Sequence, residues 1–308
     1  QLDPLMRGDQ LLSVRLFDPR LALPNEVSFR KRTIEQVRRV GKQVVIALGP
    51  SPTDPTARWL GIHLRMTGRL LHLSACEDPR QGQSADGEAK YLRMRLLLAS
   101  GGEVHFLDPR RFGTIVGTDD ASTLEPIGVD PTSRRFTRSR LAKLLAPARG
   151  PIKPWLLRQD RIVGLGNIYA SEILFRAAIH PLRSAGSLGP AEVERLHRET
   201  KAVLRDAIRN CGTTFSDFQD AHGVTGSYGS LLDVYGKEGE PCPRCTTPIE
   251  RIVQVQRSTF FCASCQPEGA IEERAEPPKR KRGPRKTKTT RSARRPRTAA
   301  RSRRASQE

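Results

Sequence analysis

The sequence predicts an α+β protein with more than one domain, and three observations support this class. The first third of the 308-residue chain contains short apolar or alternating runs, which are typical of strands. The middle of the chain places apolar residues three and four positions apart, as amphipathic helices do. Four cysteines in two close pairs follow, and they indicate a small metal-binding module.

The predicted strands of the first third are separated by turn-forming residues. We expect strands within 42–48, 58–66, 91–99 and 103–108, where the sequence reads KQVVIAL, RWLGIHLRM, YLRMRLLLA and EVHFLD. A Pro-rich stretch at 49–57 separates the first two runs, and a long polar stretch at 74–89 separates the second from the third. Residues 121–135 lack such periodicity and are interpreted as a linker.

From about Thr137 the pattern becomes helical. We expect helices within 137–146, 152–159, 166–178 and 190–211. Ser187 or the Gly189-Pro190 pair can start the last helix, because proline is tolerated in a first helical turn.

The glycine turn at 164–166 stands directly before the third predicted helix. Glycines let the backbone approach another chain closely, and the N–H groups at a helix start can bind an anion. Asn167, the next residue, can cap the helix or donate to a phosphate. Because the preceding segment is predicted to be a helix and not a strand, a nucleotide-binding loop is disfavoured. We therefore expect a helix–turn–helix element that holds a backbone phosphate.

Basic residues dominate the charge of the chain, which has a formal net charge of +20 at pH 7. Between Lys279 and Arg304 there are 14 Lys and Arg and no Asp or Glu, so the remainder carries 20 − 14 = +6. A basic fold indicates a polyanionic partner, most simply nucleic acid. Residues 268–308 hold few apolar side chains, and we expect a disordered basic tail. The tail either tethers the protein to DNA of any sequence or is a solubilising extension.

Cys242, Cys245, Cys262 and Cys265 have the spacing of a zinc site. Each CxxC turn places two thiolates on one side of a tight loop, and two such turns close a tetrahedron around Zn²⁺. Four thiolates leave no open position, so one structural Zn²⁺ is predicted. The isolated Cys76 and Cys211 are interpreted as ordinary cysteines. Because no secretory signal is visible, we expect a reducing compartment. The sequence contains no run of 18 apolar residues, so no membrane span is expected.

Six motifs extend from near Leu2 to about Gln266: GIHLRMTGRL, FLDPRRFG, IKPWLLRQDRIVGLGNIYASEILFRAAIHP, GTTFSDF, VYGKEGEPCPRC and QRSTFFCASCQ. Their order resembles the bacterial formamidopyrimidine-DNA glycosylase family, relatives of endonuclease VIII. The resemblance implies five parts. They are an N-terminal β-sandwich catalytic lobe at 1–120, a linker at 121–135, a helix–two-turn–helix DNA-binding domain at 136–230, a zinc finger at 231–267 and the tail at 268–308.

The resemblance implies roles for side chains that enter damaged DNA. Met66 resembles the residue that fills the gap left by a flipped base, Arg110 the residue that pairs with the orphaned cytosine, and Phe112 the wedge in the base stack. An apolar wedge and a guanidinium suit the hole that base flipping leaves. Taken singly, Met66 and Phe112 could be core residues and Arg110 a surface cation. Arg111 is implied to contact DNA as well.

Other residues match phosphate-contacting and catalytic positions of the family. The residues that match phosphate contacts are His63, Lys153, Asn167 and Arg257. Arg93 stands where the family often has a DNA-contacting histidine, so the positive charge is kept while the side chain differs. Lys42 matches a lysine near the abasic sugar that donates a proton in β-elimination, and Arg257 is also linked to δ-elimination.

The chain opens with QLDPLMRGDQ, which resembles the family's segment at the end of its first helix. Mature members begin Pro-Glu-Leu-Pro-Glu; the proline amine is the nucleophile and the glutamate is the acid/base. The amine attacks the sugar C1′, expels the base and forms a Schiff base that permits strand cleavage. The sequence as given is therefore expected to lack the Pro-Glu pair and to be inactive by itself, because the amine of Gln1 is not a substitute.

The resemblance implies a bifunctional DNA glycosylase and abasic-site lyase of base-excision repair. It would remove oxidised purines, such as 8-oxoguanine and formamidopyrimidines, and cleave by β,δ-elimination. We expect a monomer that binds damaged double-stranded DNA in the bacterial cytoplasm, at the nucleoid. The Gly/Ser-rich stretch at 223–229 covers the flipped base or is a plain linker.

Two other functions are considered for the whole chain. The first is a non-enzymatic protein that binds damaged DNA. The second is a basic zinc-ribbon protein unrelated to repair, which DPRRFG and GNIYASE disfavour because a zinc ribbon needs neither motif.

Overall fold

The computed structural model describes residues 1–23, 26–75, 89–213 and 226–269. The chain divides into two compact units, Gln1–Ile271 and Glu272–Glu308, and every described residue belongs to the first. Four features of the sequence lie wholly or mostly outside the described residues. They are the basic tail from 270 onward, Cys76 with its polar stretch, most of the GTTFSDF motif and residues 223–225 of the Gly/Ser-rich stretch.

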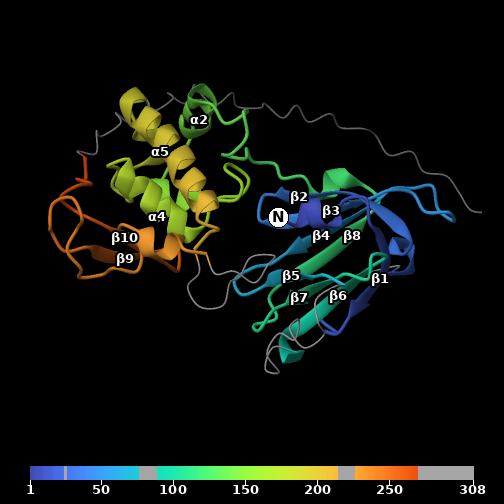
Figure 1. Cartoon of the computed structure of the whole chain (residues 1–308). Helices are drawn as coiled ribbons and strands as arrows, with labels where there is room; N and C mark the ends of the chain where they lie inside the picture. Colours follow the sequence, from blue (N-terminus) through green and yellow to red (C-terminus); the bar gives the residue numbers. More distant parts are fainter. Residues whose placement is uncertain (24–25, 76–88, 214–225, 270–308) are drawn as a thin grey trace, which may run out of the picture. The chain divides into compact units, whose positions relative to one another are not determined.

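The N-terminal part contains eight strands and a short helix, α1 (Leu2–Met6). The strands are β1 (Gln10–Leu16), β2 (Arg32–Val40), β3 (Gln43–Leu48), β4 (Arg58–His63), β5 (Arg69–Leu73), β6 (Leu92–Leu98), β7 (Glu103–Leu107) and β8 (Thr114–Thr118). They are hydrogen-bonded in the order β5-β7-β6-β1-β2-β3-β4-β8, and all pairs are antiparallel. The chain thus forms two layers, β5-β7-β6-β1 and β2-β3-β4-β8, joined where β1 meets β2 (Figure 1). The predicted β-sandwich lobe is confirmed.

Apolar side chains from both layers fill the space between them. Val14, Met94 and Phe106 come from the first layer, and Ile46 and Ile62 come from the second; each is at most 1% exposed. Successive side chains of a strand point to opposite faces, and in β3 both faces are covered: Ile46 lies in this core, whereas its neighbour Val45 packs in a second cluster with Val40 and Leu124. Burying a side chain of this size contributes roughly 1.5–3 kcal/mol. This core therefore holds the two layers together and sets the positions of the segments that join them.

The chain changes layer through two short crossovers that matter for the site. The first crossover, residues 64–68, joins β4 to β5, and the second crossover, residues 108–113, joins β7 to β8. Gly68 and Gly113 lie against the ring of the buried Phe106, where an added Cβ would come within 2.9 and 2.3 Å of ring atoms. Only glycine lets both crossovers pass this close to the core.

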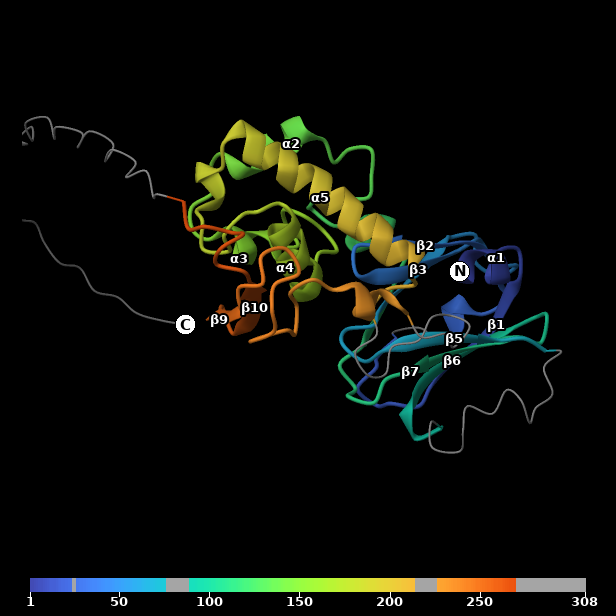
Figure 2. The same cartoon turned by 60° about the vertical axis from the view of Figure 1, so that its left-hand side comes forward.

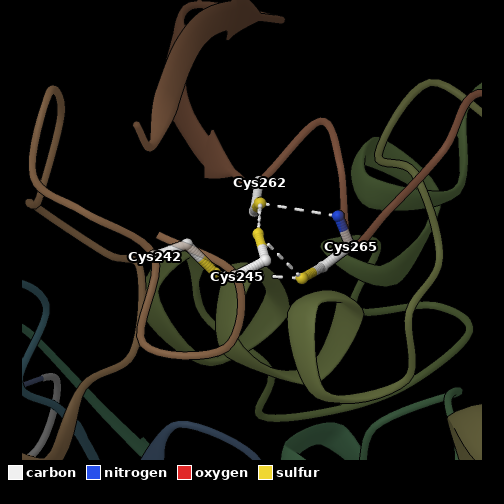
Figure 3. A group of neighbouring side chains, drawn as sticks. All are labelled: Cys242, Cys245, Cys262 and Cys265. Carbon is white, nitrogen blue, oxygen red and sulfur yellow. Dashed lines mark hydrogen bonds between the residues drawn. The ribbon is translucent and has the colours of Figure 1, made fainter. Parts of the chain in front are cut away.

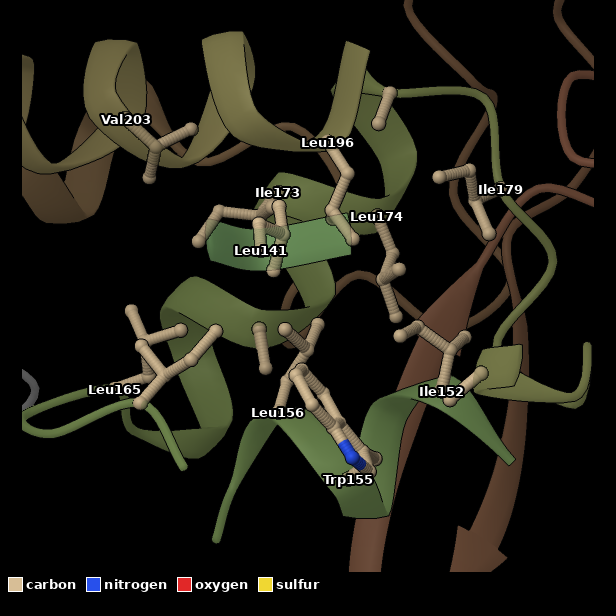
Figure 4. Close-up of a cluster of buried hydrophobic side chains, with 14 of the residues drawn as sticks. Leu141, Ile152, Trp155, Leu156, Leu165, Ile173, Leu174, Ile179, Leu196 and Val203 are labelled. Atoms are coloured by element: carbon tan, nitrogen blue, oxygen red, sulfur yellow. The ribbon is translucent and has the colours of Figure 1, made fainter. Parts of the chain in front are cut away.

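The middle of the chain forms a helical bundle of α2 (Arg138–Leu145), α3 (Ile152–Leu156), α4 (Asn167–Arg176) and α5 (Pro190–Arg209). Leu141, Leu156, Leu174 and Leu196 meet in its core (Figure 4). Of the two predicted starts of α5, the structure has the Gly189-Pro190 pair, and the Gly189 N–H donates to the Glu192 carboxylate at 2.9 Å. None of the described helices has the length and apolar character needed to cross a membrane.

The segment expected to be a linker is packed against its neighbours. It contains a short 3-10 helix, Ala121–Leu124, and the side chains of Leu124 and Val129 are buried. Asp130 forms an ion pair with Arg39 of β2. These contacts hold the segment between the strands and the helices within the first unit.

The last described part is a hairpin of β9 (Glu250–Gln254) and β10 (Arg257–Phe261), which lies beside α4 in both views (Figure 2). Glu172 of α4 is fully buried and accepts the N–H groups of Asp233, Val234 and Tyr235 at 2.8, 3.0 and 2.8 Å. Burial raises the pKa of Glu172, and the three N–H donors oppose that rise. This carboxylate joins α4 to the segment that leads into the hairpin.

Candidate nucleic-acid interface and zinc centre

Two large apolar side chains project from the crossovers into solvent. Met66 is 69% exposed and Phe112 is 53% exposed, and Arg110 beside Phe112 is exposed as well. The residue before each apolar side chain, Arg65 or Arg111, has a φ of 57° or 58°. That left-handed backbone is uncommon for a residue with a Cβ and marks a sharp turn. The interpretation of Met66 and Phe112 as core residues is therefore excluded.

A buried carboxylate lies beneath both crossovers. Asp108 is 1% exposed and accepts the Thr67 hydroxyl of the first crossover on Oδ1 at 2.5 Å. Its Oδ2 accepts the Gly113 N–H of the second crossover at 2.7 Å. The Arg110 N–H in turn donates to the Thr67 hydroxyl oxygen at 3.4 Å. The two turns that present Met66 and Phe112 are thus bonded to one side chain.

Arg111 and Arg93 are held by acceptors of the protein itself. Arg111 donates through Nε and one terminal nitrogen to the nearly buried Asp18 at 2.6 and 2.5 Å. This pair is the main reason that the pKa of Asp18 is lowered to about 2. Arg93 donates through Nε to the Asp108 carbonyl at 2.9 Å. Both side chains therefore brace the second crossover, and the DNA contacts expected of them remain predictions.

Lys42 and His63 lie near enough to other cations for those charges to lower their pKa values. Lys42 follows β2 and has an exposed side chain, yet nearby protein atoms together with the charges of Arg257 and Arg65 lower its pKa. Partial burial, then the charges of Arg65 and Lys42, lower the pKa of His63 at the end of β4. Nearby positive charges destabilise each other's protonated forms, and a bound anion would offset this repulsion.

Lys153 is a buried cation at the junction of α3, α4 and the hairpin. It is 1% exposed, and its Nζ donates to Asn167 Oδ1, the Ser258 carbonyl and Thr259 Oγ1 at 2.7, 2.8 and 2.7 Å. Burial, then the charge of Arg257, lower its pKa to about 8. None of the ion pairs found among the described residues includes Lys153.

Asn167 does not cap α4, which was one of its two expected uses. Gly166 is the N-cap residue, and the Asn167 side chain instead donates to the Ser258 carbonyl at 2.9 Å and to the Tyr235 hydroxyl at 3.3 Å. The side chain points to Ser258 of β10 and to Tyr235, which both lie beside the start of α4. Asn167 and Lys153 therefore form one polar cluster with β10, close to Arg257 at the hairpin turn.

The four paired cysteines converge on one point, as their spacing predicts (Figure 3). Their sulfur atoms all lie within 4.8 Å of one another, and three pairs are 3.4, 3.4 and 3.9 Å apart. A tetrahedron with Zn–S bonds of about 2.3 Å has S···S edges of about 3.8 Å, so the cluster fits Zn²⁺. Cys242 and Cys245 lie on a turn closed by a Pro241–Pro248 bridge, and the other pair follows β10. Cys211 lies apart from this cluster and is exposed.

A cavity of about 620 Å³ lies beside α1 and β2, and Arg38 and Arg39 of β2 are part of its lining. Its lining includes Gly41 and Leu64, which adjoin Lys42 and His63 in the chain. Most of the lining is apolar, and it includes Leu2, Val44, Tyr169 and Ile208. Arg38 and Arg39 of the lining are ion-paired with Glu125 and Asp130.

Three family models match the chain in order. The formamidopyrimidine-DNA glycosylase N-terminal domain matches residues 1–115, its H2TH domain matches residues 127–219, and the zinc finger found in FPG and IleRS matches residues 239–267.

The chain belongs to the formamidopyrimidine-DNA glycosylase family.

Several members of the family are similar along most of their length. The formamidopyrimidine-DNA glycosylase of Pelotomaculum thermopropionicum is 38% identical over 275 residues, which cover 86% of this chain and 94% of that protein. The enzyme of the same name from Symbiobacterium thermophilum is 39% identical over 295 residues and 91% of each chain.

Solved structures of the family have the same fold. The MutM (Fpg) protein from Thermus thermophilus is 35% identical, with a TM-score of 0.72 over 86% of this chain and 94% of that one. Lactococcus lactis Fpg in complex with DNA containing an abasic site is 29% identical, with a TM-score of 0.74 over 87% and 96%.

In this member of the glycosylase family, the exposed residues of the site were predicted from the sequence, whereas the buried residues that hold them in place were not. Met66, Arg110 and Phe112 lie together on the crossovers, and the family match at 239–267 assigns the four cysteines to a zinc finger. The supporting residues that were missed are Asp18, Thr67, Asp108, Glu172 and Thr259. Thr67 and Asp108 stand inside the quoted motifs LRMTG and DPRRFG, so a signal was present without a role.

Proposed function

We propose that this protein is a DNA glycosylase of base-excision repair that removes oxidised purines and then cleaves the strand as an abasic-site lyase. The observation that carries the proposal is the pair of exposed apolar side chains, Met66 and Phe112, with Arg110 on the same braced turns. A basic surface alone would bind DNA, but it would not need two protruding hydrophobic residues. Among the relatives, a mutant of Lactococcus lactis Fpg has been crystallised with DNA containing Fapy-dG, and Lactococcus lactis Fpg with DNA containing an abasic site.

The proposed recognition step is the extrusion of one damaged nucleotide. Phe112 enters the base stack as a wedge, Met66 fills the space that the flipped base leaves, and Arg110 donates to the orphaned cytosine. Guanidinium N–H groups suit the acceptors of a cytosine edge, and the apolar side chains replace lost stacking. The choice of oxidised purines rests on the similarity to family members.

The proposed phosphate contacts come from the cationic groups around β2, β4, α4 and the hairpin. His63 and Arg257 reach phosphate oxygens, and Asn167 does so once its 3.3 Å bond to the Tyr235 hydroxyl is given up. Arg93 and Arg111 hold the second crossover while their outer edges face the DNA. Lys153 acts through its charge and through Asn167, because its three N–H bonds are already used within the protein. Burial and, after it, repulsion by neighbouring cations lower the pKa of Lys42, His63 and Lys153, and an anionic phosphate would offset the repulsion.

The proposed chemistry is nucleophilic attack by an amine on the sugar C1′. The bond from C1′ to the base breaks, the base leaves with a proton, and the resulting Schiff base makes the neighbouring C–H bonds acidic enough for elimination. Lys42 donates a proton during β-elimination, and its lowered pKa suits that role because it makes the ammonium a better acid. Arg257 assists the δ-elimination step. The zinc finger, which bound Zn²⁺ rigidifies, holds the hairpin that carries Arg257.

Borohydride trapping tests the proposal, because a Schiff base between protein and DNA becomes permanent on reduction. The chain as given and a version beginning Met-Pro-Glu-Leu-Pro-Glu, with a first helix and with the initiator methionine removed, are mixed with a duplex carrying 8-oxoguanine opposite cytosine. A covalent adduct with the second version supports the glycosylase and lyase. An adduct with the given chain that disappears in Lys42→Ala would make Lys42 the nucleophile.

Tight, lesion-specific binding without an adduct in either version would overturn the enzymatic proposal in favour of a protein that only binds damaged DNA. The same preparations address the tail. If deletion of residues after Gln266 leaves DNA affinity at moderate salt unchanged, the tail is not a tether. A monomer acting on chromosomal DNA in the bacterial cytoplasm fits the proposed function.

A further inference from the structure

Hydrogen bonds hold both the carboxylate and the backbone of Asp108. Both of its oxygens are used, one by the Thr67 hydroxyl and one by the Gly113 N–H. Its own N–H donates to the Tyr91 carbonyl at 2.9 Å, and its carbonyl accepts from Arg93. A carboxylate held at both ends in this way has one orientation, so the two groups bonded to it are also fixed in distance and direction.

Met66 and Phe112 each stand next in the chain to a residue that is hydrogen-bonded to this carboxylate. Met66 precedes Thr67 in the chain, and Phe112 precedes Gly113. Neighbouring Cα atoms are about 3.8 Å apart, so the backbone of each exposed residue lies close to an anchored atom. Arg110 is attached more directly, because its own N–H donates to the Thr67 hydroxyl oxygen.

The Phe106 ring supplies the steric half of the same support. Gly68 and Gly113 both lie against this ring, at places where a Cβ on either would overlap ring carbons. The crossovers therefore cannot sink toward the core, and the hydrogen bonds to Asp108 keep them from lifting away. The support combines one buried ring with one buried carboxylate.

We propose that Thr67 and Asp108 are positioning residues that hold Met66, Arg110 and Phe112 as one preformed unit for entry into DNA. The inference rests on the proposed function, because it assigns a purpose to the spacing of the residues that enter the duplex. Residues that are ordered before binding lose less conformational entropy on binding. The pair Asp18–Arg111 bonds the second crossover to the segment that follows β1.

The decisive variant is Thr67→Val, which keeps the shape of the side chain and removes the hydroxyl. It leaves Asp108 Oδ1 and the Arg110 N–H without their partner, while Met66, Arg110 and Phe112 are all retained. Thr67→Ser is the conservative variant, since it restores the hydroxyl. Thr200→Val is the matched control: Thr200 is fully buried in α5 and its hydroxyl donates to the Leu196 carbonyl at 2.7 Å.

The assay is equilibrium binding of the full chain to three fluorescent duplexes of one sequence, which requires no catalysis. The first carries a tetrahydrofuran abasic analogue opposite cytosine, the second carries the analogue opposite adenine, and the third is undamaged. We expect Thr67→Val to bind the first duplex about tenfold more weakly, since about 1.4 kcal/mol of lost hydrogen bonding corresponds to tenfold. Binding to undamaged duplex stays within about twofold, and the preference for cytosine over adenine shrinks.

The other variants separate positioning from general stability. Thr67→Ser should recover the specific affinity, and Thr200→Val should lower the melting temperature without changing the ratio of abasic to undamaged binding. If Thr67→Val does not fold at 25 °C, Thr67→Ala takes its place in the same comparison.

Two outcomes overturn different statements. If Thr67→Val keeps the wild-type ratio while Met66→Ala, Arg110→Ala and Phe112→Ala each lower it, the positioning role is wrong and the proposed function stands. If the wild-type chain binds all three duplexes equally, and these three alanine variants change nothing, the proposed function itself is wrong.

Discussion

The buried ammonium of Lys153 should make DNA affinity depend on pH above neutrality. Its pKa of about 8 in the unbound protein results from burial and from the charge of Arg257. A phosphate bound beside Asn167 and Arg257 favours the charged form, so the pKa of Lys153 is higher in the complex. The unbound protein therefore loses this proton at a lower pH than the complex does. Affinity is constant below about pH 8 and falls as the pH rises beyond it.

The size of the effect follows from the two pKa values. If the complex restores the ordinary lysine pKa of about 10.4, affinity at pH 9 is about tenfold lower than at pH 7. If the complex raises the pKa only to about 9, the loss is about fivefold. We therefore expect a decrease of roughly five- to tenfold over these two pH units.

The measurement is fluorescence anisotropy with the abasic-analogue duplex between pH 7 and 9 at constant ionic strength, because salt changes affinity strongly. Lys153→Met should bind more weakly at pH 7 and should show no decline, so that its curve meets the wild-type curve at high pH. Lys42→Arg is the control for the other lysine with a lowered pKa. A decline that persists in Lys153→Met, or that vanishes in Lys42→Arg, would refute this reasoning.

Three further predictions concern the zinc finger and its attachment. Glu172→Gln should lower the free energy of unfolding by about 2 kcal/mol, because the amide places an N–H donor where the carboxylate accepted a buried N–H. Thermal unfolding followed by circular dichroism measures this loss, and an unchanged melting temperature would count against it. Cys245→Ser should lower bound zinc, measured by elemental analysis, and weaken DNA binding, whereas Cys211→Ser should change neither. Arg257→Ala should reduce the slope of log affinity against log salt by about 1 if Arg257 contacts one phosphate, and an unchanged slope would remove that contact.

The sequence predicted the main helices and half of the strands of the N-terminal lobe, and it missed β1, β2, β5 and β8. The four predicted helices contain α2 to α5, and β3, β4, β6 and β7 lie within predicted runs. Strand β2 was missed because its sequence, RTIEQVRRV, carries four charged residues. One of them, Arg32, is fully buried and donates to the Gly49 carbonyl and Asp54, an arrangement that no local pattern reveals.

The site was predictable where chemistry is local and unpredictable where it is tertiary. Cysteine spacing was sufficient for the zinc cluster, since each CxxC turn is complete in four residues. The bond between Thr67 and Asp108 joins residues 41 positions apart, and Asn167 meets Ser258 at a separation of 91. Such pairs exist only after the layers and helices have packed. For the same reason, the sequence could not exclude capping of α4, which was one of the two uses considered for Asn167 and is not the one seen.

The crossovers between layers bear on how this surface can change in evolution. Loops usually tolerate insertions, and binding surfaces often diversify by loop length. Here one extra residue in either crossover would have to be absorbed against the Phe106 ring and the Asp108 carboxylate. If the strand absorbed it instead, every side chain of that strand would turn to the opposite face. We therefore expect this surface to diversify by exchanging the side chains at Met66, Arg110 and Phe112, while the lengths of both segments stay the same.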